Sequence, residues 1–453
     1  MVHMLRFRWK QLALDYGMVF VLIALGAGFS AATISVRYGE DEDAAVTLAG
    51  RIVSDYGAQV PVLVATRDSA NGVAFGEAFE SALKAAGGVV VGNTGGTPAD
   101  ARKALVELAA SGTLPRVIAG PQAAGNDVFN SQSLEKIHPD LANVPFLHPP
   151  GQRWPVFLTQ GNLLNVATQI VVIAIIAIGM TMVIITAGID LSVGSLIALS
   201  ACMATAIIHW AAGGGATSDV GVGVVVGACA AAILVCGLIG LFSGVMLTAF
   251  QIPAFIVTLA IMLIARGLAY KATGGQALGS LPDSFAWLGH HDVMGIPVSV
   301  VIMVTFYGAA FLLMNYSRLG RYIYAVGGNL EAARLSGVPV NRVLITVYTV
   351  CGLLAGLGGI IMGSELKTGD PKTGQLYELY VIAAVVVGGT SLAGGQGRIF
   401  GTLIGAFIIG VVRNGMNLCN VKPFNQYIVF GGIILLAVLL EKLKGRLWNQ
   451  TDV

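Results

Sequence analysis

Asp190 and Ser192 stand two positions apart in a glycine-bounded break, Gly188 to Gly194, between two long apolar stretches. A carboxylate near bilayer depth is costly, and its default interpretation is a functional polar site. The alternative is structural, because either side chain can cap a helix beginning at Val193 by accepting hydrogen bonds from its free N–H groups. The two interpretations are compatible if the break directs the N-terminus of that helix at a polar ligand.

A second set of residues lies in a basic segment, Arg318 to Arg342, between two further apolar stretches. The stretch Glu331 to Gly337, with the sequence EAARLSG, predicts a short helix that ends at its glycine, because glycine tolerates the left-handed conformation at a helix end. Ala332 and Ala333 give this helix a small-residue face that permits close approach of another protein. The alternative is an ordinary loop in which the EAA triplet occurs by chance.

Other motifs for chemistry are missing from the sequence. No phosphate-binding GxxxxGK[ST] loop is present, and the glycine-rich stretch Gly388 to Arg398 predicts a tight turn between packed helices instead. The five cysteines show no CxxC spacing, and no histidine has metal-ligand spacing with a carboxylate. We therefore expect no catalytic residue, no metal site and no cofactor bound by this chain. Any ATP hydrolysis must occur on another polypeptide.

The elements that hold these residues are membrane helices. The chain is 55% hydrophobic and 11% charged, whereas soluble domains carry about 25% charged residues. Several apolar runs reach the roughly 18–20 residues that a helix needs to span a bilayer. After a first span near 18–36, spans are expected near 163–187, 192–210, 220–250, 253–272, 297–316, 343–363, 377–394, 399–417 and 424–441, which makes about ten.

Basic residues indicate the orientation of these spans. Arg6, Arg8 and Lys10 precede the first apolar run, which argues for a cytoplasmic N-terminus. That run also resembles a signal peptide, with small residues at its end, but we favour an uncleaved helix. With ten spans the other basic clusters also fall on the cytoplasmic side, and both termini are cytoplasmic. These clusters are Arg318 to Arg342, Arg398, and Lys442 to Arg446.

A hydrophilic block of residues 38–155 interrupts the membrane pattern. Expected strands at 60–65, 89–91 and 116–119 alternate with helices at 75–83 and 98–111, which indicates a small parallel α/β unit. The expected fold is an all-α polytopic membrane protein with this small α/β insert outside the cytoplasm. Its parts are 1–37 (cytoplasmic segment and first helix), 38–155 (periplasmic insert), 156–445 (membrane domain with the loop 318–342) and 446–453 (cytoplasmic tail).

Three motifs resemble one family over about residues 160–445. They are Gly188 to Gly194, Gly320 to Asn329 followed by the EAA stretch, and Ala383 to Gly395. Together they resemble the ribose/xylose/galactose-type permeases of bacterial ABC importers. The resemblance implies ten-helix subunits that pair as homodimers in the inner membrane, with no nucleic-acid partner. It also implies a cytoplasmic ATPase that holds ATP and Mg²⁺, and a periplasmic sugar-binding protein.

The resemblance assigns a role to the EAA stretch. In that family the short helix docks on the separate ATPase and couples its closure to alternating access. The corresponding coupling residues here are Gly328, Asn329, Glu331, Ala332, Ala333 and Gly337. The insert resembles half of a type I periplasmic sugar-binding protein. It departs from the permease family and leaves open how a separate binding protein docks.

A sugar path needs hydroxyl and amide partners and aromatic faces. The candidates in addition to Asp190 and Ser192 are Asn165, Gln169, Phe255, Thr258, Glu378 and Tyr380. For each of them the alternative is helix–helix hydrogen bonding or packing against lipid. Arg266 is expected to reach the interface or to pair with an acid. The breaks at 188–194 and 388–397 are interpreted as corresponding points of two half-repeats.

Two other classes of protein compete with a permease. An ion-driven secondary sugar transporter would need buried acids, and only Asp190 and Glu378 qualify. A membrane-tethered sugar sensor would bind its ligand in the outer block. The EAA stretch argues against both. The outer block has three possible roles: docking of a binding protein, partial sugar binding, or no role in transport. The sequence does not identify the sugar.

Overall fold

The computed structural model describes the backbone of residues 2–125 and 127–449, and side chains within 17–439 except 37, 70 and 127. The chain forms two compact units. One is the continuous segment Ile34–Pro155, and the other combines the residues before it with those after it. Each unit is described by itself.

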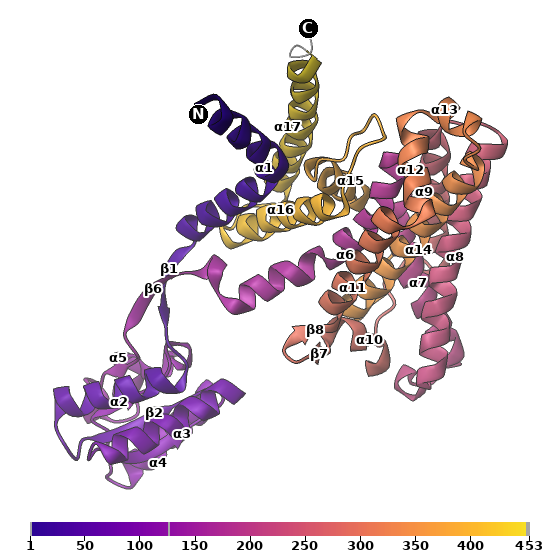
Figure 1. The fold of residues 1–453 in the computed structure, drawn as a ribbon. Coiled ribbons are helices and arrows are strands. Elements are labelled where there is room, and N and C mark those ends of the chain that lie inside the picture. Colours follow the sequence, from indigo (N-terminus) through magenta and orange to yellow (C-terminus); the bar gives the residue numbers. More distant parts are fainter. Residues whose placement is uncertain (1, 126, 450–453) are drawn as a thin grey trace. The chain divides into compact units, whose positions relative to one another are not determined.

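The larger unit is helical (Figure 1). Besides a short hairpin of β7 (Asp292–Val293) and β8 (Ile296–Pro297) and two single 3₁₀ turns, it consists of helices. These are α1 (Val2–Ala32), α6 (Gln160–Ile185), α7 (Val193–Ala211), α8 (Val222–Ala249), α9 (Ala254–Thr273), α10 (Asp283–His290), α11 (Val298–Tyr316), α12 (Arg318–Gly328), α13 (Leu330–Leu335), α14 (Val340–Leu366), α15 (Tyr377–Val387), α16 (Ile399–Leu418) and α17 (Pro423–Asn449).

Seven helices in the described residues are long and apolar enough to cross a membrane: α6, α7, α8, α9, α11, α14 and α16. The chain is therefore a mainly helical, multi-pass membrane protein. Three shorter apolar helices, Gly17–Ala32, α15 and Pro423–Leu439, lie where the sequence predicts the first, eighth and tenth spans. The first apolar run does not form one element, since α1 ends at Ala32 and residues from Ile34 form a strand.

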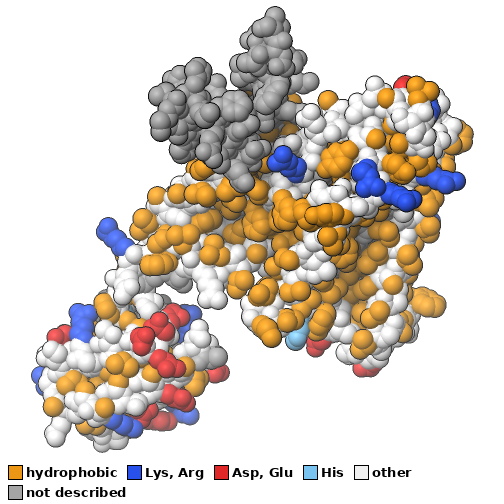
Figure 2. Space-filling model, viewed as in Figure 1, with side chains coloured by type: hydrophobic (Ala, Val, Ile, Leu, Met, Phe, Trp, Pro, Cys, Tyr) orange, Lys and Arg blue, Asp and Glu red, His pale blue; other side chains and the backbone are white. Residues whose placement is uncertain are grey.

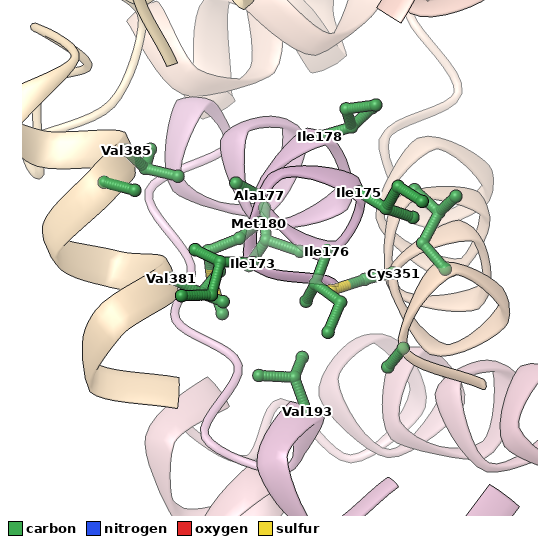
Figure 3. Packing of buried hydrophobic residues seen from close by; sticks show 14 of the residues in the cluster. Ile173, Ile175, Ile176, Ala177, Ile178, Met180, Val193, Cys351, Val381 and Val385 are labelled. Atoms are coloured by element: carbon green, nitrogen blue, oxygen red, sulfur yellow. The ribbon is translucent and has the colours of Figure 1, made fainter. Parts of the chain in front are cut away.

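Helix α6 lies at the centre of this unit. Every residue from Ile170 to Thr186 is buried. Figure 3 shows its isoleucines and Met180 packed among Val193 of α7, Cys351 of α14, and Val381 and Val385 of α15. Lipid tails are as apolar as these side chains, so close packing and hydrogen bonds, rather than hydrophobic burial, hold membrane helices together.

Small residues permit the most extensive helix–helix contact in the described chain, between α8 and α14. Gly240 and Gly244 on α8, and Gly352 and Gly356 on α14, are each spaced as GxxxG, and all four lie directly against the other helix. A methyl group added to Gly352 would lie 3.2 Å from the Gly240 Cα. Any larger side chain at these four positions would force the two helices apart.

The smaller unit, Ile34–Pro155, is an α/β layer structure (Figure 1). Its four parallel strands run in the order β3 (Val89–Thr94), β2 (Pro61–Ala65), β4 (Val117–Ala119) and β5 (Phe146–Leu147). Its helices are α2 (Glu42–Tyr56), α3 (Ala70–Ala85), α4 (Pro98–Ala110) and α5 (Ser131–Glu135), with three short 3₁₀ turns. A separate antiparallel pair joins β1 (Ile34–Tyr38) to β6 (Gly151–Pro155).

The sheet of this unit is covered on both faces. Val62 and Val64 of β2 pack in a cluster with the buried faces of α2 and α3. Leu63 and Ala65, which point to the opposite face, pack in a second cluster with α4 and α5. Successive side chains of β2 therefore point into two separate apolar clusters, which explains why the sequence of this strand is continuously apolar.

Helix starts in this unit follow local capping. The helix expected at 75–83 begins earlier, at Ala70, because the Ser69 side chain accepts a hydrogen bond from Gly72 N at 3.1 Å. Thr97 and Asp100 form a reciprocal capping box at the start of α4. The hydrogen bonds from Thr97 lower the pKa of the exposed Asp100 carboxyl.

Candidate functional site

The first site element is the break between α6 and α7. Asp190 is 1% exposed, and its Oδ1 accepts hydrogen bonds from Ser192 N at 2.9 Å and from Ser192 Oγ at 2.6 Å. Ser192 precedes α7 but makes no side-chain capping bond. The prediction that one of these side chains caps α7 is therefore wrong, because the carboxylate bonds to Ser192 itself. Ser192 already has helical angles (φ −80°, ψ −17°), so its hydroxyl turns back to the carboxylate.

Helix α14 encloses this carboxylate. The Cys351 thiol lies within hydrogen-bonding reach of Asp190. Tyr348, also fully buried, covers the break, since a methyl group added to Gly188 would lie 2.5 Å from its hydroxyl oxygen. Asp190 thus fixes the turn from inside the protein, and protein groups surround it in this conformation.

A second break, residues 367–376, lies between α14 and α15 and meets the first. Arg266 of α9 donates Nη1 hydrogen bonds to Pro371 O and Thr373 O, both at 2.7 Å. Its Nη2 donates to Gly194 O at 3.3 Å. Irregular backbone at membrane depth needs such internal partners. Arg266 therefore forms no ion pair in the described part of the chain, contrary to one of its two predicted roles, and hydrogen-bonds to backbone carbonyls of the two breaks instead.

Glu378 lies at the same junction. A methyl group added to Gly194 would overlap the Glu378 carboxylate and lie 2.5 Å from Gly374 O. The carboxylate therefore faces the first turn of α7, where the helix dipole favours negative charge. The break that meets 188–194 at this junction is therefore 367–376.

The other predicted path residues are dispersed. Thr258 is fully buried and donates to Ile189 O at 3.4 Å, which links α9 to the first break. Asn165 and Gln169 hydrogen-bond to each other on α6 at 3.2 Å. Phe255 is 55% exposed. Asp190, Ser192, Thr258 and Glu378 therefore surround the two breaks, whereas Tyr380 lies in an aromatic group on α15.

The EAA stretch forms α13, directly after α12. Asn329 begins it, since its side chain accepts a hydrogen bond from Ala332 N at 2.9 Å. Gly337 ends it with φ +81°. Of the two alanines predicted to form a small-residue face, Ala332 is exposed but Ala333 is buried. Ala333 packs into the core of its own chain, because α13 must anchor there, so it is not part of the exposed face.

The exposed face of α13 combines charge with one apolar tip. Glu331 and Arg334 form an exposed ion pair at 3.4 Å, and Leu335 is 88% exposed. Figure 2 shows Lys and Arg side chains on this unit gathered mainly near the end that holds α12 and α13. Gly328 is also exposed, and no atom lies within 4 Å of where its Cβ would be.

The glycine stretch is the expected turn between α15 and α16, and it packs on α12. Gly395 N donates to Ile185 O, the end of α6, at 2.8 Å. Tyr324 Oη of α12 donates to Gly397 O at 2.8 Å. A methyl group on Gly327 would overlap Ile185 O and lie 2.7 Å from Gly395 N. This turn therefore joins the helix before α13 to the end of α6 that leads into the Asp190 break.

Sequence reasoning missed two kinds of residue. Arg266 had been given only generic roles, because its backbone partners are distant in sequence. Arg413, in the apolar helix α16, was overlooked although an intramembrane arginine is itself a signal of function. Among the described residues, no three or more His, Cys, Asp or Glu side chains form a group that could hold a metal.

The α/β unit has its own cavity of about 150 Å³. It lies at the carboxyl ends of β2 and β3, where open parallel sheets bind ligands. Arg67, Thr94 and Phe129 are among its lining residues. The volume is below the roughly 300 Å³ at which ligand pockets begin.

The larger unit is a multi-pass helical body in which two broken segments meet and a short exposed helix follows a basic stretch. The chain belongs to the family described as "Branched-chain amino acid transport system / permease component", which it matches over residues 162–438. The α/β unit lies outside this match. No solved structure matches the chain.

Three relatives carry names that specify a transported sugar. The chain is 47% identical over 294 residues to the "Ribose import permease protein RbsC" of Escherichia coli (strain K12), covering 64% of this chain and 88% of the relative. It is 41% identical over 292 residues to the protein of the same name from Bacillus subtilis, covering 64% and 87%. It is 38% identical over 290 residues to the "L-arabinose ABC transporter permease protein AraH" of Azospirillum brasilense, covering 64% and 82%. These matches confirm the resemblance that the motifs indicate.

Proposed function

We propose that this chain is the membrane permease subunit of an ATP-driven importer of a pentose, hexose or polyol. The supporting observation is its similarity to permeases named for ribose and arabinose import, at 47% identity over 294 residues and 38% identity over 290 residues. The subunit is a transporter component and not an enzyme. A separate cytoplasmic ATPase supplies ATP and Mg²⁺ chemistry, and the chain itself binds no cofactor.

In this proposal α13 is the docking element for the ATPase. Leu335 inserts between partner side chains, while Glu331 and Arg334 form a polar rim around it. Gly328, Asn329 and Gly337 fix the start and end of the helix. Ala333 anchors α13 in the membrane unit, so that a displacement of α13 also moves α12.

The coupling route runs from α12 into the two breaks. Tyr324 and Gly327 contact the glycine turn, and that turn hydrogen-bonds to the end of α6. Only residues 186–192 separate this point from α7. Closure of the ATPase would tilt α12, shift the turn and reorient the break, which opens the path to one side at a time.

The path residues take different roles. Asp190 and Ser192 hold the first break in shape, and Thr258 and Arg266 tie it to α9 and to the second break. Glu378 stands beside the N-terminus of α7, where it can accept hydrogen bonds from sugar hydroxyls. Asn165, Gln169, Phe255 and Tyr380 are further contacts along the path.

The topology in this proposal has ten spans, both termini in the cytoplasm, and location in the bacterial inner membrane as a homodimer. The three shorter apolar helices complete the seven long ones. The basic segment around α12 and α13 then faces the cytoplasm, as cytoplasmic loops favour Lys and Arg.

The α/β unit then lies in the periplasm. Its cavity of about 150 Å³ is open on a single lobe and cannot enclose a sugar, so capture would be weak. We therefore favour a role in docking or regulating a periplasmic sugar-binding protein. Partial sugar binding and decoration are the alternatives.

Uptake in cells that lack their own sugar permeases tests this function. The chain is produced with its cognate ATPase and binding protein, and labelled pentoses, hexoses and polyols are offered. Saturable uptake of at least one, abolished when the ATPase is omitted, is expected. Uptake that is unchanged without the ATPase would contradict the proposal.

A further inference from the structure

Arg413 is a cationic residue in an apolar helix. Most of its N–H groups have no hydrogen-bond acceptor among the described residues. It lies on α16, and its Nη1 donates to Tyr377 Oη at a long 3.5 Å. Among the described residues this is its only hydrogen bond, and it forms no ion pair. A guanidinium offers five N–H donors. A half-buried charge in an apolar helix with so few polar partners is costly, and its default interpretation is a functional site.

Aromatic rings stand around this cation. The Arg413 guanidinium carbon lies 5.9 Å from the centre of the Tyr380 ring. Tyr380 in turn meets Phe430 of α17 edge-on at 4.8 Å and Tyr377 at 5.9 Å.

We propose that Arg413 and Tyr380 form a contact subsite for the transported sugar, an inference that rests on the proposed function. The two groups supply what a neutral sugar ring needs. The guanidinium donates to hydroxyl oxygens, and the Tyr380 ring packs on C–H surface.

The place of the subsite in the fold supports this role. Tyr377 and Glu378 are the first residues of α15, the helix whose start meets α7 at Gly194. Glu378 faces that junction, whereas Tyr377 faces Arg413. The subsite therefore adjoins the two breaks across the start of one short helix, and movement of α15 would change both together.

A competing explanation is that Arg413 only holds α15 to α16. Tyr377→Phe distinguishes the two explanations, because it deletes the one hydrogen-bond acceptor that Arg413 has among the described residues and leaves the guanidinium in place. A subsite predicts that this variant keeps its KM for sugar within about twofold, since the contact with the ligand remains. A purely structural role predicts that Tyr377→Phe and Arg413→Lys behave alike.

The experiment measures uptake kinetics in proteoliposomes that hold the full chain and its ATPase, for each sugar that the wild type transports. Arg413→Lys keeps the charge but loses the planar fork, so KM should rise about tenfold with little change in maximal rate. Tyr380→Leu should do the same through loss of the ring, while Tyr380→Phe should stay within about twofold.

The matched control is another cation–aromatic pair of the same unit. Lys422 lies 5.8 Å from the centre of the Phe424 ring, and both side chains are exposed. Lys422→Gln and Phe424→Leu should leave KM unchanged. Thermal unfolding of each purified variant shows whether folding has changed.

The outcomes distinguish this inference from the proposed function. Absence of ATP-dependent sugar uptake by the wild type would overturn both. Wild-type uptake with an unaltered KM in Arg413→Lys and Tyr380→Leu would overturn the subsite alone. So would equal losses in Tyr377→Phe and Arg413→Lys, which would show a helix–helix contact.

Discussion

Replacing Gly327 by alanine tests the coupling route at its tightest point. The added Cβ would overlap Ile185 O and lie 2.7 Å from Gly395 N. Both are backbone atoms, so neither can rotate away as a side chain would. The next residue, Gly328, offers a matched control, because an added Cβ there meets no atom within 4 Å.

The magnitude follows from three local terms. Overpacking in a well-packed region costs about 1–3 kcal/mol. Loss of the bond from Gly395 N to Ile185 O adds about 1 kcal/mol, and the better helix propensity of alanine returns about 1 kcal/mol. The net cost of about 2 kcal/mol falls on the contact between α12 and the glycine turn. It corresponds to a shift of more than tenfold in the population of that contact.

The assay compares the two variants in proteoliposomes with the ATPase. Co-purification of the ATPase should be unchanged in both, because α13 keeps its exposed face. Gly327→Ala should lose about tenfold in sugar uptake per ATP hydrolysed. Gly328→Ala should stay near the wild type.

Equal coupling in the two variants would refute this reasoning, because the only relevant difference between them is the contact with Ile185 and Gly395. Loss of ATPase binding in Gly327→Ala would also count against it. That result would place the defect at the docking helix rather than behind it.

Three other changes address docking, topology and the outer unit. Glu331→Lys reverses the charge beside Arg334, and Gly337→Trp places a bulky side chain at a φ of +81°. Both variants should insert into the membrane normally but lose pull-down of the ATPase and transport. Full ATPase binding and transport in both would show that the coupling site lies elsewhere. A cysteine replacing exposed Ser81 should react with an impermeant thiol reagent in intact spheroplasts, whereas labelling only after lysis would reverse the topology. The 34–155 unit has its own core on both faces of its sheet, so it can be studied in isolation. Calorimetry on it should show no sugar bound with a Kd below roughly 100 µM, about −5.5 kcal/mol. A sub-micromolar sugar complex would show that this unit is a sugar receptor.

Local patterns explain the parts of the fold that the sequence predicts well. Apolar length places α6, α7, α8, α9, α11, α14 and α16, because a bilayer sets the length of a spanning helix. Strands β2, β3 and β4 follow from short apolar runs between glycine and proline turns. Helix α2 was missed, since a four-residue acidic run, 40–43, spans its start and hides the Asp41 cap.

Long-range contacts explain what the sequence does not show. The partners of Arg266 are carbonyls more than a hundred positions away, in Pro371 and Thr373, and backbone groups leave no trace in residue type. The pairing of the break at 186–192 with 367–376 is invisible for the same reason. The sequence predicts the glycine turn itself. It does not predict that Tyr324 and Gly327 of α12 pack on this turn, because they are about 70 positions away in the sequence.

The Asp190 break shows a third limit. Residue types at 190 and 192 are those of a helix cap, and they fit the capping pattern. The actual bonds depend on the backbone angles of Ser192, which are already helical. A sequence motif can therefore place a polar turn without specifying its hydrogen bonds.

The most direct measurement reconstitutes the purified chain, with and without its ATPase, in proteoliposomes loaded with ATP and Mg²⁺ and supplied with labelled ribose or arabinose and the cognate sugar-binding protein. The chain alone should hydrolyse no ATP and move no sugar. Together with the ATPase, it should accumulate sugar only when ATP is on the ATPase side, and collapse of ion gradients should have no effect. Accumulation without the ATPase, or driven by an ion gradient, would contradict an ATP-driven permease.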